Sequence, residues 1–85
     1  MRITVDVPDY DGNSLDVIWD REGKYNICVD GNSIVLSANR EALISFAKQF
    51  LYFTQTKFPE GSHIHFDSFF CRGLSGVYEL VVQTL

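Results

Sequence analysis

The period of the hydrophobic pattern changes twice along this chain, and these changes constrain the fold more than any other sequence feature. Up to residue 37, apolar residues recur at every second position in four short segments separated by turn residues. This alternation is typical of half-buried strands. From Asn39 the period lengthens to that of an amphipathic helix, and after residue 62 it returns to two. The predicted element order is therefore β-β-β-β-α-β-β.

The strand boundaries follow from turn chemistry. Pro8 ends the first strand because it has no N–H for a ladder, and Asp30-Gly31-Asn32 is a strong signal for a tight hairpin turn. The six predicted strands cover residues 2–7, 14–21, 24–30, 33–37, 63–67 and 77–83. Within the hairpin, the residues expected to face the core are Tyr25, Ile27, Val29, Ile34 and Leu36.

The predicted helix begins after Asn39, a good N-cap residue, and Glu41 in its first turn suits the helix dipole. We expect about four to five turns, stopped by the segment Phe58-Pro59-Glu60-Gly61. The stripe predicted to face the sheet comprises Leu43, Phe46, Ala47, Phe50 and Thr54. The side predicted to face solvent comprises Glu41, Ser45, Lys48, Gln49, Tyr52 and Gln55.

One helix cannot cover both faces of six strands. The predicted fold class is therefore α+β in two layers, with a mostly antiparallel six-stranded sheet and one amphipathic helix packed on one face. A length of 85 residues favours a single domain, 1–85.

Composition narrows the function. The net charge is −4 without any Lys/Arg cluster, which argues against a nucleic-acid partner. No stretch approaches the length of a membrane span, and charges interrupt the N-terminal segment before it reaches signal-peptide length. Two cysteines, Cys28 and Cys71, are too few for a disulfide framework. These features predict a cytoplasmic protein with reduced thiols and no membrane partner.

The sheet face that the helix leaves open mixes acids and histidines with apolar residues. Such a face favours a protein partner, and an acidic protein suits a basic one. The loop 68–76 adds two large aromatics and an arginine, which are common at interfaces. The residues predicted to bind a partner are Asp16, Ile18, Asp20, His63, His65, Asp67, Phe69, Phe70, Arg72 and Glu79. The alternative use of this face is a homodimer that buries Ile18, Val35 and Val81.

The stretch Gly61-Ser62-His63-Ile64-His65-Phe66-Asp67 also resembles a metal site. His63 and His65 project from one side of a strand, and Asp67 or Glu79 would be a third ligand. Structural zinc sites require four ligands, so we predict no metal and no cofactor. A solvated face whose imidazoles pair with Asp67 or Glu79 is the preferred interpretation. No catalytic motif accompanies these residues, and we predict no enzyme.

From the helix onward the chain resembles a family of small bacterial immunity proteins found in polymorphic-toxin gene neighbourhoods. The resemblance covers about residues 39–83: a helix, an H-x-H-x-D strand, a G-L loop and a final strand with E-L. It implies a cytoplasmic protein that binds and neutralises a cognate toxin domain without catalysis. A homodimeric binding module and, less favoured, a histidine-based metal-binding protein remain as alternatives. The matching positions are Leu43, Gly61, Ser62, His63, His65, Asp67, Leu74, Glu79 and Leu80.

Overall fold

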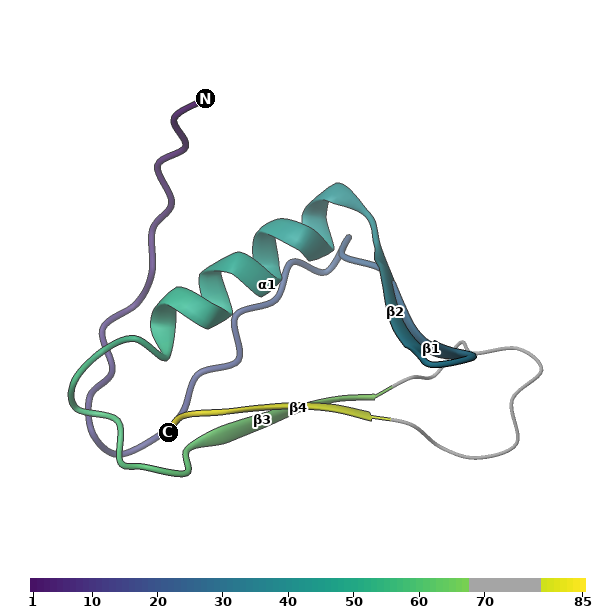
Figure 1. The fold of residues 1–85 in the computed structure, drawn as a ribbon. Coiled ribbons are helices and arrows are strands. Elements are labelled where there is room, and N and C mark those ends of the chain that lie inside the picture. The colour runs from purple at the N-terminus through teal and green to yellow at the C-terminus, as the bar shows by residue number, and fades with distance from the viewer. Residues whose placement is uncertain (68–78) are drawn as a thin grey trace.

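The computed structural model describes residues 1–67 and 79–85 and contains one helix and two antiparallel hairpins (Figure 1). Strand β1 (Tyr25–Asp30) pairs with β2 (Ser33–Ala38), and β3 (His63–Asp67) pairs with β4 (Glu79–Gln83). Helix α1 (Arg40–Tyr52) connects the two hairpins. The α+β class is confirmed. The six-stranded sheet is wrong, because the described strands form two separate two-stranded sheets.

The predicted strands 2–7 and 14–21 are absent, and the second has a clear physical reason. Residues 8–20, here called the N-terminal segment, lie along α1, and their backbone groups bond to side chains of α1 and of Gln55 beyond it. The N–H donors to α1 are Asp16, Ile18 and Asp20, and their spacing of two residues is that of an extended chain. The alternating sequence therefore produces an extended segment, but its hydrogen bonds go to a helix rather than to a neighbouring strand.

These contacts form a ladder along one side of α1. The Gln49 side chain accepts a hydrogen bond from Ile18 N at 2.8 Å and donates one to Asp16 O at 3.3 Å. The rungs on either side join Asp16 N to Tyr52 Oη at 2.9 Å and Asp20 N to Ser45 Oγ at 3.0 Å. A final rung beyond the helix joins Tyr10 N to Gln55 Oε1 at 2.8 Å.

The helix starts where the sequence predicts. Asn39 is the N-cap, and its side-chain oxygen accepts hydrogen bonds from Ala42 N and Lys24 N, each at 2.9 Å. Its amide donates to Glu22 O, also at 2.9 Å, so one side chain ties the helix to the chain before β1. The helix spans 13 residues and ends at Tyr52, before the predicted stop.

The face that α1 buries differs from the prediction. Its buried residues are Ala42, Ser45, Phe46, Gln49 and Tyr52. Of the predicted inward stripe only Phe46 is buried, whereas Leu43, Ala47, Phe50 and Thr54 are exposed. Burying Gln49 and Tyr52 completely is tolerable because the N-terminal segment supplies their hydrogen-bond partners. The helix is therefore turned toward that segment.

The core lies between α1 and the two hairpins. Its buried cluster comprises Ile27, Ala42, Phe46, Ile64 and Phe66. The prediction that Ile64 and Phe66 are core residues is confirmed. The rings of Phe46 and Phe66 lie 4.7 Å apart, and Trp19 packs edge-on against Phe46 at 5.2 Å. Leu80 and Val82 of β4 pack against the same cluster.

The β1–β2 hairpin leaves the core as it approaches its turn, where Gly31 takes a positive φ of 59°. Ile27 is buried, but Leu36 and Ile34, predicted to face the core, are 39% and 74% exposed. Their prediction as core residues is wrong. Cys28 in β1 is disulfide-bonded, so the prediction of reduced thiols fails for this residue. Cys71 lies outside the described residues.

Candidate protein-binding surface

The outward side of the β3–β4 hairpin collects the exposed side chains of the H-x-H strand and its partner. Because Ile64 and Phe66 point into the core, the alternating residues His63 and His65 point to solvent. In the antiparallel register His65 lies opposite Val81 and His63 opposite Gln83, while Glu79 is diagonal to His65. We call the set of His63, His65, Glu79, Val81 and Gln83 the β3–β4 outer face.

Contacts between neighbouring groups fix the positions of the two histidine side chains on this outer face. His65 Nδ1 lies 3.1 Å from Glu79 Oε1, with the two side chains 48% and 45% exposed. His63 Nδ1 lies 3.0 Å from Gly61 O, and the two imidazole rings are 5.0 Å apart edge to face. The predicted pairing of a histidine with Glu79 is confirmed. The surface thus combines a positioned polar pair with the exposed apolar side chain of Val81.

A metal site requires several ligands to converge on one point. Among residues 1–67 and 79–85, no group of three or more His, Cys, Asp or Glu side chains is placed to hold a metal ion. Glu79 is instead engaged with His65. The backbone of Asp67 lies opposite that of Glu79 in the β3–β4 register, and the side chain of Asp67 is not among the described groups.

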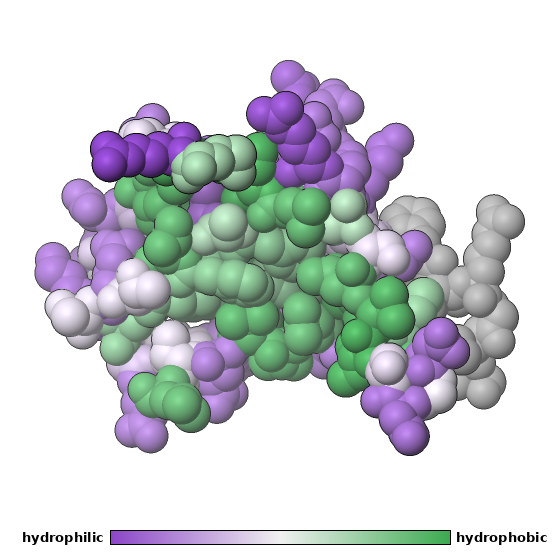
Figure 2. Space-filling view, turned by 45° about the horizontal axis from the view of Figure 1, so that its top comes forward, coloured by the Kyte–Doolittle hydropathy of each residue, from purple (hydrophilic) through white to green (hydrophobic). Residues whose placement is uncertain are grey.

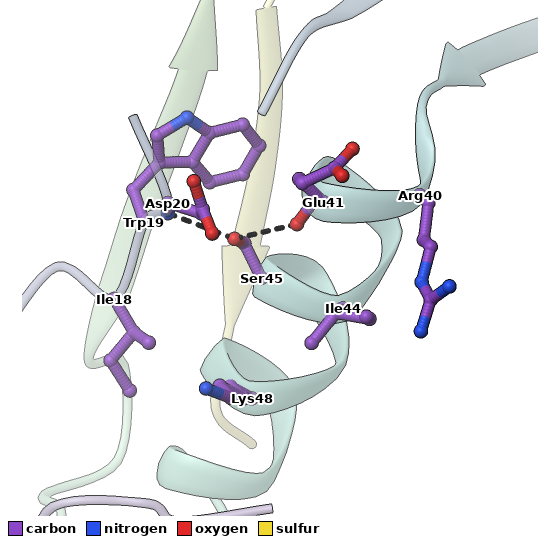
Figure 3. Close-up of a pocket in the computed structure, with 8 residues that line it drawn as sticks. All are labelled: Ile18, Trp19, Asp20, Arg40, Glu41, Ile44, Ser45 and Lys48. Atoms are coloured by element: carbon purple, nitrogen blue, oxygen red, sulfur yellow. Dashed lines mark hydrogen bonds between the residues drawn. The ribbon is translucent and has the colours of Figure 1, made fainter. Parts of the chain in front are cut away.

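The structure separates the N-terminal candidates from the histidines. Ile18 and Asp20 line a cavity of about 440 Å³ between the N-terminal segment and α1 (Figure 3). Asp16 lies next to it in the chain, held by the ladder. The predicted single open face therefore becomes two surfaces. The full lining of the cavity is Ile18, Trp19, Asp20, Arg40, Glu41, Ile44, Ser45 and Lys48.

Polar groups of this cavity join the N-terminal segment to α1. Its hydroxyl group, on Ser45, donates to Glu41 O at 2.8 Å and accepts from Asp20 N at 3.0 Å (Figure 3). The lining residues include no histidine or cysteine that could activate the Ser45 hydroxyl. Arg40 and Lys48 balance the two carboxylates, so the cavity has no strong preference for either sign of ligand charge. The cavity is best understood as the junction between helix and N-terminal segment.

Three predicted contact residues, Phe69, Phe70 and Arg72, lie outside the described residues. Sequence reasoning also missed the ladder side chains Ser45, Gln49 and Tyr52. Their spacing of four and three residues puts them on one helix face, which was the available signal. That face was predicted to be solvated because its residues are polar.

No helix in the described ranges is long and apolar enough to cross a membrane. Neither the curated proteins nor the solved structures include a match to this chain. The model of one protein family does match: it is described as Immunity protein 32 and covers residues 33–83, more than half of the chain. The matched part starts at β2 and includes α1, β3 and β4. This chain belongs to the Immunity protein 32 family.

Proposed function

We propose that this protein binds a cognate bacterial toxin domain and neutralises it by protein–protein contact, without catalysis. The observation that carries the proposal is the match to Immunity protein 32 over β2, α1, β3 and β4. The lack of a nucleophile–base pair in the α1 cavity supports a binding role. In this proposal the toxin belongs to a polymorphic toxin system, as the resemblance implies.

The β3–β4 outer face is the proposed contact surface. It lies inside the family match, whereas Asp16, Ile18 and Asp20 precede it. Its exposed pair of His65 and Glu79 supplies hydrogen-bonding groups, and Val81 supplies apolar area beside them. Interfaces usually combine such an apolar centre with a polar rim. Phe69, Phe70 and Arg72 stay proposed contact residues on the sequence argument alone, because they lie outside the described residues.

Charge supports a basic partner. The chain carries 11 acidic and 7 basic side chains, and the outer face itself contains Glu79. Opposite net charges accelerate encounter and align the partners before they dock. A basic toxin domain would therefore associate quickly at low salt.

The proposal is tested by expressing the protein with the toxin encoded next to its gene. Growth should be restored by the wild-type chain and reduced by Glu79→Lys together with Val81→Asp. Glu22→Lys with Ile3→Asp is the matched control, since both residues are exposed and lie off the outer face. If the wild-type chain rescues no neighbouring toxin, the function is wrong. If only the control pair abolishes rescue, the surface is wrong.

The cytoplasm is the proposed compartment, because a toxin that acts inside the cell must be met there. Disulfides persist mainly in oxidising compartments, so the bonded Cys28 makes this proposal directly testable. If the protein resides in the cytoplasm, the disulfide of the structure should be reduced in the cell, and alkylation in freshly lysed cells should modify Cys28. A Cys28 that stays protected from alkylation until a reductant is added would argue for an oxidising location.

A further inference from the structure

The two histidines of the chain lie side by side on the β3–β4 outer face, and their separation suits two ligands of one metal ion. Both are exposed and occupy alternate positions of β3. Their ring centres are 5.0 Å apart. With Zn–N bonds of about 2.0–2.1 Å, two imidazoles on one tetrahedral ion have ring centres about 5 Å apart. The two rings are therefore already at the separation that a shared ion requires.

The hydrogen bonds of the two rings determine which nitrogen can bind an ion. Nδ1 of His63 lies 3.0 Å from Gly61 O, and Nδ1 of His65 lies 3.1 Å from Glu79 Oε1. A carbonyl or carboxylate oxygen can only accept, so each Nδ1 carries a proton and donates it. In the neutral imidazole Nε2 then keeps its lone pair. Metal-binding histidines are typically held in this way, with one nitrogen on the ion and the other donating to a carbonyl or carboxylate oxygen.

We propose that His63 and His65 bind one divalent transition-metal ion through their Nε2 atoms. Imidazole suits zinc, copper and nickel, whereas magnesium and calcium prefer oxygen ligands. Glu79 orients His65 in this site, and its carboxylate favours a cation nearby. The proposal concerns the isolated chain and does not rest on the toxin-binding role. It replaces the sequence-based prediction of no metal, which was argued for a structural site with four protein ligands.

Two protein ligands leave the ion with open coordination positions. Gln83 lies opposite His63 and Val81 opposite His65, and all four residues are exposed to solvent. Hydrophobic residues gather elsewhere, over α1 and the β1–β2 hairpin (Figure 2). In the part of the chain that the structure describes, no third His, Cys, Asp or Glu completes a metal-binding group. Water therefore fills the remaining positions in this proposal, and the site differs from a structural zinc site, whose four ligands all come from protein.

Calorimetric titration of the untagged full chain with zinc chloride tests the site. One ion should bind per chain, and magnesium chloride should give no binding. His63→Ala and His65→Ala should each weaken zinc binding at least about tenfold, because even the loss of a group that only orients a ligand typically costs that much. Gln83→Ala, an exposed change on the same face, should leave the affinity unchanged. Glu79→Gln keeps an acceptor oxygen for His65 and should weaken binding less than either histidine variant.

Nitrogen NMR of the imidazoles identifies the bound atoms. Because the chain has two histidines, every imidazole signal belongs to this site. Adding zinc should shift Nε2 of both rings and leave Nδ1 protonated. Absence of a shift, or zinc binding that survives when both histidines are changed to alanine, overturns the proposal. Zinc on Nδ1 overturns the binding atoms assigned to the site. A loss on Glu79→Gln equal to that of the histidine variants overturns the two-histidine site in favour of three ligands. Circular dichroism confirms that each variant folds, as expected for changes at exposed positions.

Discussion

The side-chain amide of Gln49 in α1 is fully buried and bonds to the backbone of Ile18, 31 positions earlier in the chain. It accepts from Ile18 N and donates to Asp16 O, so one amide replaces the partner strand that this segment lacks. A polar residue in the helix therefore holds the N-terminal segment in place. Several consequences of this arrangement and of the core beneath it can be measured.

Gln49→Leu should destabilise the fold although leucine is apolar and similar in size. The substitution leaves Ile18 N–H and Asp16 C=O without partners, at a cost of about 1–3 kcal/mol for each group that stays buried. Urea unfolding measures the loss. Gln83→Leu, the same change at an exposed strand position, should alter stability by less than about 0.5 kcal/mol. Equal effects of the two changes would contradict the ladder.

Hydrogen exchange should locate the effect of Gln49→Leu. The amides of Asp16, Ile18 and Asp20 are the donors of the ladder. Their exchange should accelerate in the variant more than that of the β3 amides, because the N-terminal segment can open locally while the core remains folded. Uniform acceleration of all amides would mean that the segment and the core unfold together.

Substitutions at Phe46 and Phe50 test which face of α1 is turned toward the core. Phe46 is 3% exposed and Phe50 44% exposed. Phe46→Ala should cost about 3–5 kcal/mol through lost burial and a cavity, whereas Phe50→Ala should cost much less. Thermal unfolding of both variants gives the comparison. A larger loss at Phe50 would support the helix orientation predicted from hydrophobic periodicity.

Asn39 should contribute to stability through two separable interactions. Asn39→Ala removes both the cap oxygen and the amide that donates to Glu22 O, and a cost of about 1–2 kcal/mol is expected from the cap alone. Asn39→Asp keeps the oxygen that accepts from Ala42 N and loses only the amide. It should therefore fall between wild type and Asn39→Ala in urea unfolding. An aspartate variant as unstable as the alanine variant would place the main contribution in the bond to Glu22.

Glu79 should influence how fast the toxin is found. Glu79→Lys removes the acidic partner of His65 and reverses the charge of the outer face. If the toxin is basic, its association rate should fall most at low salt, because salt screens exposed charges. Stopped-flow measurements at two ionic strengths, with Glu22→Lys as the matched charge change, provide the test. An association rate that is equal in both variants would place the contact elsewhere.

The local sequence was sufficient to predict the elements whose own residues define them. The turn at Asp30-Gly31-Asn32, the cap at Asn39 and the alternation around Ile64 and Phe66 each predicted the correct structure. The α+β class followed from the single change to a helical period. In each case the deciding interaction lies within a few residues along the chain.

The sequence-based predictions were wrong where contacts between distant segments of the chain determine the local structure. The alternation of residues 14–21 is that of a strand, but backbone partners come from Gln49 and Tyr52 of α1. Because a polar helix face usually meets water, hydrophobic periodicity placed Leu43 and Phe50 inward instead. The residues predicted to form one site lie on two surfaces for the same reason. Asp20 is positioned by its contact with α1, whereas His65 and Glu79 are positioned by the β3–β4 hairpin.

The attachment of the N-terminal segment also orders the events of synthesis. The ribosome makes this segment before α1, yet its hydrogen-bond partners lie 25 to 47 residues later in the chain. Closing such long loops carries an entropic cost that local turns avoid. The nascent chain must therefore emerge past Gln55 before its beginning can be fixed. The N-terminal segment is thus translated before its partners but becomes ordered only after them.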